Sequence, residues 1–268
     1  MSRTCKVGQV PNLLKMMRRS GTCTTILNLL LLPALAQDPR QIVAESQKRA
    51  QSQSQQYEGT LEVIGASNKV SIKHWAYDRV GSFGASKAIL RFTAPPEVKG
   101  VALLIVNHPD RASDQWMWIP SLERDRRVSV QDRSTRFFGT DFSFEDLEER
   151  DVNQFDYKLL GEDTIDGQPC WKIESKPRES KSSQYTSVIL SVRKDVYLAI
   201  QIENYTKDKL IRRIHYSDVQ QSDNIWTGRT VEVFDATRNS RTVLKLEKLH
   251  YNVPLKDSDF TIEALRRG

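Results

Sequence analysis

Cysteine is scarce in this sequence, which holds three cysteines in 268 residues. Two of them, Cys5 and Cys23, precede residue 37, so the remainder of the chain contains Cys170 alone and cannot form an internal disulfide. The fold must therefore be stabilised by burial of apolar surface. Because free cysteine is among the most buried residue types, we predict that Cys170 is a small buried hydrophobe and not a nucleophile.

Long apolar runs are also missing. The longest, Ile26–Ala36, is shorter than the roughly 20 residues that a bilayer span requires. It ends in Ala34-Leu35-Ala36 and follows a stretch with five basic residues: Arg3, Lys6, Lys15, Arg18 and Arg19. This order is typical of a secretory signal peptide, and it predicts export to the periplasm with cleavage between Ala36 and Gln37.

No charge of one sign dominates the predicted mature chain. Residues 1–36 carry five of the 40 basic residues and none of the 34 acidic ones, so 35 basic residues remain against 34 acidic residues. A near-neutral chain lacks the positive field that draws proteins to nucleic acid. With no zinc-finger, recognition-helix or RNP-type motif present, we exclude nucleic acid as a partner.

Catalytic signatures are absent as well. The four histidines are isolated from one another, and the sequence has no zinc-protease motif, nucleophile elbow, phosphate loop, dinucleotide fingerprint or cysteine pair. Five acids do cluster, but on a short helix predicted from Ser143 to Arg150 they favour a solvated face: Asp141, Glu145, Asp146, Glu148 and Glu149. We therefore predict no catalytic residue, no metal site and no cofactor.

A helix followed by many short strands is what the pattern does predict. A helix is expected over residues 37–56, after which the apolar period changes to two. The expected strands are 57–64, 69–77, 86–93, 100–106, 114–119, 125–131, 155–161, 169–175, 185–193, 196–205, 209–217, 225–234 and 241–251, with a last helix over Thr261–Arg267. This composition indicates an α+β fold in which helices cover one face of a curved antiparallel sheet.

Basic residues gather in one predicted hairpin, at Arg124, Arg126 and Arg127. They could form a docking patch for an acidic partner or a lipid headgroup. The alternative, which the interleaved Glu123 and Asp125 favour, is a hairpin with mixed charges exposed to water.

Three blocks in the middle of the chain resemble one family. They are Pro96–Leu104 (PEVKGVALL), Asp114–Leu122 (DQWMWIPSL) and Phe138–Leu147 (FGTDFSFEDL), and in order and spacing they are similar to the outer-membrane lipoprotein-sorting, LolA-like proteins. Weaker similarity continues through residues 157–173, 241–244 and 259–265. The resemblance covers nearly all of the predicted mature chain.

The resemblance implies a LolA/LolB-like half-barrel of about eleven antiparallel strands over residues 57–268, closed by a few helices, whose apolar concave face receives acyl chains. Its implied partners are lipoprotein acyl chains or other envelope lipids, with an RND-type inner-membrane permease or an outer-membrane acceptor beside it. The cavity would be lined by residues of the apolar runs: Leu61, Val63, Ile72, Leu90, Phe92, Leu104, Trp116, Trp118, Phe138 and Phe142.

Three functions follow from these expectations. The first is a periplasmic carrier of lipoproteins or lipids, the second a lipid-sensing accessory module of a permease, and the third an envelope hydrolase, which the missing motifs disfavour. The sequence departs from the carriers of the family at one point: they use an arginine on the first strand to hold a lid helix, and the segment Tyr57–Glu62 offers acids there.

The predicted cleavage can be checked on the protein recovered from cells. We expect a soluble periplasmic product that begins at Gln37 and carries no acyl group, because Cys23 precedes the apolar run and a lipoprotein leader places its cysteine after it. Intact-mass spectrometry measures this directly. A product that retains Cys23 with an attached diacylglycerol would contradict the prediction.

Overall fold

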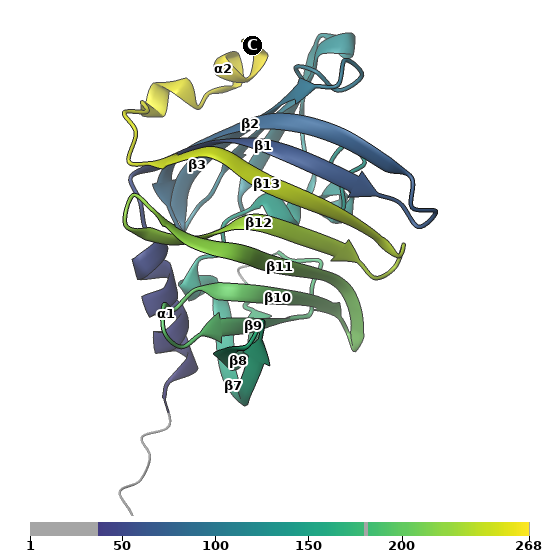
Figure 1. Cartoon of the computed structure of the whole chain (residues 1–268). Coiled ribbons are helices and arrows are strands. Elements are labelled where there is room, and N and C mark those ends of the chain that lie inside the picture. Colours follow the sequence, from purple (N-terminus) through teal and green to yellow (C-terminus); the bar gives the residue numbers. More distant parts are fainter. Residues whose placement is uncertain (1–36, 180–181, 268) are drawn as a thin grey trace, which may run out of the picture. The chain divides into compact units, whose positions relative to one another are not determined.

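A single antiparallel sheet dominates the computed structural model, which describes residues 37–179 and 182–267 (Figure 1). The predicted signal peptide, residues 1–36, lies outside the described residues. Within them the sheet has thirteen strands in the order β6-β5-β4-β3-β2-β1-β13-β12-β11-β10-β9-β8-β7. The strands are β1 (Ser54–Ile64), β2 (Val70–Ser82), β3 (Ala85–Ala94), β4 (Ala102–Val106), β5 (Asp114–Ile119), β6 (Arg124–Arg127), β7 (Phe155–Ile165), β8 (Gln168–Pro177), β9 (Ser187–Arg193), β10 (Ala199–Thr206), β11 (Lys209–Ser222), β12 (Ile225–Asp235) and β13 (Ser240–Tyr251).

The predicted α+β architecture is confirmed. Each of the thirteen expected runs overlaps one strand, two more strands than the family resemblance implies. Consecutive strands are neighbours except β6 and β7, and the pairing of β1 with β13 joins the two halves of the sheet. The edges are β6 and β7, and the segment between them, residues 128–154, packs on the inner face of the curled sheet.

Alternation along β1 shows how the sequence selects this inner face. Tyr57, Gly59, Leu61 and Val63 are buried, and the residues between them are more exposed. Gly59 is required by close packing, because a Cβ atom at this position would collide with the indole of Trp75 and with the side chain of Leu244. The glycine thus lets the Trp75 ring lie directly on the neighbouring strand.

Helix α1 (Pro39–Ala50) covers the β7–β9 end of the inner face. It begins after Asp38, whose carboxylate accepts a hydrogen bond from the backbone N–H of Arg40 at 3.0 Å, and Pro39 occupies the first turn. Ile42 and Val43 are its buried residues. The helix is shorter than the predicted 37–56, because the chain is already extended at Ser54, where β1 begins.

The outer face of the sheet is covered at β4 and β5 by the end of the chain. There the 3₁₀ turn η5 (Asp257–Asp259) leads into helix α2 (Ile262–Arg266), which the sequence predicts over Thr261–Arg267. Phe260 and Leu265 pack there against Ala102 and Leu104. Both faces of β4 are therefore buried, which explains its unbroken apolar sequence.

An aromatic segment fills the inner face beneath β1–β5. Phe137, Phe142 and Phe144 are buried against Trp75 and Phe92, with the rings of Phe92 and Phe137 stacked at 5.3 Å. Phe138 and Gly139 adopt positive φ values of 44° and 76°, so the chain turns back on itself there. We call residues 137–144 the aromatic plug.

The helix predicted from Ser143 to Arg150 does not form. Residues 143–150 contain only the 3₁₀ turn η3 (Glu145–Leu147), flanked by the turns η2 (Val130–Ser134) and η4 (Val152–Gln154); the remaining turn, η1 (Pro120–Leu122), precedes β6. The predicted solvated face is also wrong. Glu145 and Glu148 are buried, and the Glu145 carboxylate accepts hydrogen bonds from Ser183 Oγ and from the backbone N–H of Gln184.

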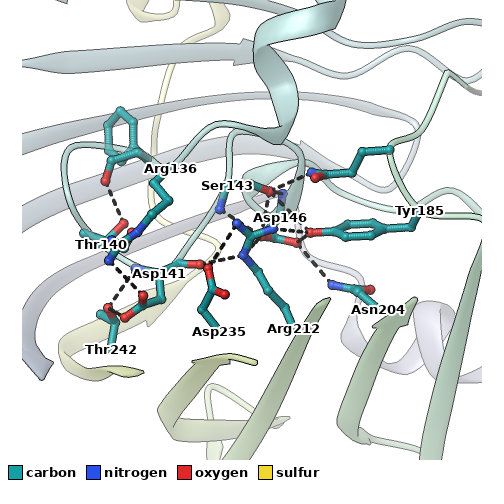
Figure 2. Close-up of polar contacts among 12 residues, drawn as sticks. Arg136, Thr140, Asp141, Ser143, Asp146, Tyr185, Asn204, Arg212, Asp235 and Thr242 are labelled. Carbon is teal, nitrogen blue, oxygen red and sulfur yellow. Dashed lines mark hydrogen bonds and ion pairs between the residues drawn. The ribbon is translucent and has the colours of Figure 1, made fainter. Parts of the chain in front are cut away.

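Two buried carboxylates hold the plug to the sheet (Figure 2). Asp141, fully buried, accepts hydrogen bonds from Ser240 Oγ at 2.6 Å and from Thr242 Oγ1 at 2.8 Å, and it pairs with Arg136 at 2.8 Å. Both oxygens of the carboxylate thereby accept hydrogen bonds. The side chain of Asp141 thus joins the plug to the beginning of β13.

Asp146 forms the second anchor in Figure 2, opposite Arg212 of β11. Its carboxylate accepts hydrogen bonds from Tyr185 Oη at 2.7 Å and Asn204 Nδ2 at 3.2 Å, and it lies 3.5 Å from Arg212 Nε. Arg212 also lies 3.5 Å from Asp235 and donates to the backbone oxygen of Asp141 at 2.9 Å. Arg212 thus connects both anchors.

Removal of one anchor should be far more costly than removal of a surface ion pair. We expect Asp141→Ala to lower the free energy of unfolding by about 3 kcal/mol or more, because it leaves two buried hydroxyls without this acceptor and Arg136 without its carboxylate partner. The matched control is Asp132→Ala, which breaks an exposed pair with Arg126 and should cost less than about 1 kcal/mol. Urea unfolding midpoints of the two variants test this; equal losses would contradict it.

Candidate functional site

A cavity of about 360 Å³ lies between α1 and the inner face of the sheet. Its walls come from α1, from the segment 146–150 and from strands on the β7–β13 side, where Figure 1 shows the helix running beside the strand ends. Nine branched aliphatic side chains make up much of the apolar wall: Val43, Leu190, Val192, Leu198, Ile202, Ile214, Ile225, Val231 and Leu246. We call this space the main cavity.

The main cavity exists because two separate hydrophobic cores do not merge. One core is built around the aromatic plug and includes Ile214, Val231 and Leu246. The other lies under α1 and includes Val43 and Leu190. Residues of both cores line the main cavity. The plug fills the inner face on the β1–β5 side, and no comparable segment fills the space beside α1.

Aromatic side chains lie at the margin of this cavity. Trp226, near the start of β12, lines it and is nevertheless 38% exposed, so this ring marks a place where the cavity meets solvent. Phe83, in the tight turn between β2 and β3, also lines it. Tryptophan at such a place gives the cavity a built-in fluorescent reporter.

One side of the main cavity is polar. Arg79, 3% exposed, lies 3.3 Å from Glu149 and donates hydrogen bonds to Ser52 Oγ, Ser82 Oγ and the backbone oxygen of Gly81. Ser86 Oγ donates to the other carboxylate oxygen of Glu149. Arg79 and Glu149 therefore neutralise each other within the wall.

The tyrosines of the wall stay neutral. Burial raises the pKa of Tyr157 to about 12, and burial also raises the pKa of Tyr216. Neither phenol is poised to act as a base near neutral pH. Together with the aliphatic wall, these side chains form a surface suited to holding an apolar chain and not to transferring protons.

A second cavity, of about 410 Å³, opens near the β6 edge of the sheet. It is lined by apolar side chains and by three charged ones: Met117, Val128, Phe138, Phe144, Arg126, Arg136 and Asp132, with Thr135 and Gly139 completing the wall. The plug separates it from the main cavity, and the two share no lining residue.

The structure does not bring the predicted cavity residues together. Only Phe138 lines a cavity, and it is the second one. Five others are buried inside the core on the inner face: Leu61, Val63, Leu90, Phe92 and Phe142. Here the space that the family resemblance assigns to acyl chains is occupied by the plug.

Four predicted positions require correction, because they lie on the outer face. Leu104, Trp116 and Trp118 pack under α2, and Ile72 is 53% exposed. Met117, between the two tryptophans, faces inward from β5 and lines the second cavity. Neighbours in a strand point to opposite faces, and an apolar run such as Trp116–Ile119 gives no sign of which face is inner.

The three arginines predicted to form a docking patch also lie at different places on the sheet. Arg126 lines the second cavity and pairs with Asp132 at 2.6 Å. Arg127 pairs with Asp114 and lies 5.9 Å from the centre of the Trp116 ring, on the outer face. Arg124 is exposed at the sheet edge. A docking role for them stays a prediction.

Five of the nine branched aliphatic residues of the main cavity, all of which the sequence analysis missed, belong to β10–β13. Ile202, Ile214, Val231 and Leu246 each alternate with polar neighbours, so their orientation was readable, but nothing in the sequence says that they face a void. Cys170 is fully buried, as predicted, and burial raises the pKa of its thiol.

Residues 37–179 and 182–267 contain neither a candidate metal site nor a candidate membrane span. No group of three or more histidine, cysteine, aspartate or glutamate side chains there is arranged to hold a metal ion. No helix in that part of the chain is long and apolar enough to cross a bilayer.

Solved structures share this fold. One is a domain from Vibrio parahaemolyticus that is provisionally described as an outer membrane lipoprotein-sorting protein domain. It superposes with a TM-score of 0.80 at 24% identity, over 85% of this chain and 98% of that one. A DUF1329 family protein from Desulfovibrio piger gives 0.79 at 28% identity, over 85% and 99%. A LolA superfamily protein from Nitrosomonas europaea gives 0.67 at 18% identity, over 85% and 99%.

No curated protein shows significant similarity to this sequence. A family model described only as "Uncharacterized protein"-like matches residues 84–267, which is more than half of the chain. The chain therefore belongs to that family, and its resemblance to the LolA-like, outer-membrane lipoprotein-sorting proteins, inferred above from three sequence blocks, is confirmed.

Proposed function

We propose that this protein is a carrier that shields the acyl chain of a lipoprotein or another envelope lipid in the main cavity. The observation that carries the proposal is the aliphatic void between α1 and the sheet, about 360 Å³ in volume. Pockets of this size and lining are typical of small apolar ligands. An empty apolar cavity lowers the stability of a fold, so a cavity of this size favours a role in binding.

The energetics suit reversible binding. Burial of an acyl chain of 14 to 16 carbons gains on the order of 10 kcal/mol before the losses of association. A carrier must hold its cargo out of water without exceeding what a receiving membrane offers. A wall of Leu, Ile and Val side chains without a covalent or metal anchor fits that requirement.

The setting of the function is the bacterial envelope. The predicted leader directs the chain to the periplasm, and the similar domain from Vibrio parahaemolyticus is described as one for outer membrane lipoprotein sorting. The proposed route of the cargo runs toward the outer membrane, with an RND-type permease or an outer-membrane acceptor as partner. No catalytic step is part of the proposal.

A fatty-acid probe with environment-sensitive fluorescence should bind with one-to-one stoichiometry and be displaced by unlabelled lipid. Ala199→Phe places a ring in the main cavity and should weaken binding about tenfold or more, since each methylene that loses its contacts costs about 0.8 kcal/mol. Emission of Trp226 should shift when the wild-type cavity fills. Titration with both signals measures the two effects.

The matched control for this titration is Ile72→Phe, which adds a ring to the exposed outer face of β2 and should leave the affinity unchanged. If both variants bind like the wild type, the main cavity is not the binding site. A protein that binds no probe at all removes the carrier proposal.

Transfer of cargo separates a carrier from a lipid-sensing accessory module. We expect the loaded protein to deliver a fluorescent lipid from donor vesicles to acceptor vesicles faster than spontaneous exchange, because the cavity wall holds the chain without a covalent bond. Loss of self-quenching in the donor reports the rate. Tight binding without accelerated transfer would favour the sensing module.

A further inference from the structure

Arg150 is the unusual residue of the main cavity. It lies at the wall between η3 and η4 and is partly buried. Its guanidinium donates one hydrogen bond, from Nη2 to Asn204 Oδ1 at 3.1 Å, and lies 5.5 Å from the centre of the Phe155 ring. Within residues 37–179 and 182–267, no carboxylate forms an ion pair with it.

Of the acids near Arg150, Asp151 accepts a hydrogen bond from the backbone N–H of Asn153 at 2.7 Å, and the others have partners of their own. Glu149 pairs with Arg79, Asp146 lies between Tyr185 and Arg212, and Glu145 accepts hydrogen bonds from Ser183 and Gln184. Glu148 accepts a hydrogen bond from Gln115 at 2.8 Å and lies 3.4 Å from Arg133. The cavity wall therefore presents one cation whose remaining N–H groups have no anionic acceptor.

The buried network fixes where this cation lies. Asn204, seen at the end of the network in Figure 2, donates its amide N–H to Asp146 and so turns its oxygen toward Arg150. The backbone of the same segment is held by α1, because Gln47 Nε2 donates to the backbone oxygen of Arg150 and Gln47 Oε1 accepts from the N–H of Val152. Arg150 is thus held in place from two sides.

We infer that the main cavity selects an acyl chain ending in an anionic group, a carboxylate or a phosphate, which Arg150 binds while the chain lies on Ile202, Ile214 and Leu246. The inference rests on the proposed function and narrows it to a ligand class. A guanidinium presents donors in a planar fork that matches both anions, and such charge-assisted hydrogen bonds gain strength in an apolar surrounding. A neutral lipid would leave the same donors unpaired.

The electrostatic surroundings agree with an inward-facing charge. Arg150 acts against the burial that raises the pKa of Tyr157 and of Tyr216, two phenols of the cavity wall. Its positive charge is therefore felt inside the cavity and is not confined to the surface.

Two pairs of ligands with the same acyl chain test the inference: palmitate against hexadecanol, and palmitoyl lysophosphatidic acid against monopalmitoylglycerol. Displacement of a neutral fluorescent probe gives each affinity. We expect the anionic member of at least one pair to bind about tenfold more tightly than its neutral partner. The pair with the larger ratio tells whether a carboxylate or a phosphate is preferred.

Arg150→Gln should abolish the preference by weakening only the anionic ligands, and Arg150→Lys should restore part of it, since lysine keeps the charge without the fork. Arg266→Gln, the matched loss of one arginine on α2, where it pairs with Asp125 on the outer face, should leave the preference intact. Thermal melts establish that the variants are folded. The ratio of anionic to neutral affinity in the wild-type protein tests the inference even if a variant does not fold.

Equal affinity of the wild type for anionic and neutral ligands would overturn the inference and leave the carrier proposal standing. So would an Arg150→Gln variant that keeps the wild-type ratio. If no ligand of either pair binds, the proposed function itself fails.

Discussion

The buried network of ion pairs and hydrogen bonds around Arg212 is the constraint on which the rest of this structure depends. Through it, the long segment between the two edge strands is held against the inner face of the sheet, and the aromatic plug stays where it fills one half of the half-barrel. Such a network is costly to bury and is worthwhile only when every member is satisfied. Here the two aspartates, the tyrosine and the arginine satisfy one another.

Filling one half leaves the other half hollow. The plug packs tightly against β1–β5, and α1 packs against β7–β9, so the space between these two cores becomes the main cavity. The position of the cavity therefore follows from where the plug ends. The position of the proposed binding site therefore depends on how residues 128–154, between the edge strands β6 and β7, are anchored to the sheet.

Period-two patterning was enough to predict most of the sheet, because polar and apolar side chains alternate along most of the strands. It failed at Trp116 and Trp118, where both faces are buried, one by the plug and the other by α2. It failed again at Glu145 and Glu148, whose partners come from distant parts of the chain. A void cannot be predicted in this way at all, since it depends on which side chains do not meet.

The two hydrogen bonds of Gln47 have a mechanical consequence. They tie the middle of α1 to the backbone on either side of Asp151, the same stretch that carries Arg150. A displacement of the helix that widens the hollow must also pull on the chain that carries its cation. Any movement of α1 away from the sheet would therefore strain these two hydrogen bonds and loosen one of the restraints on the position of Arg150.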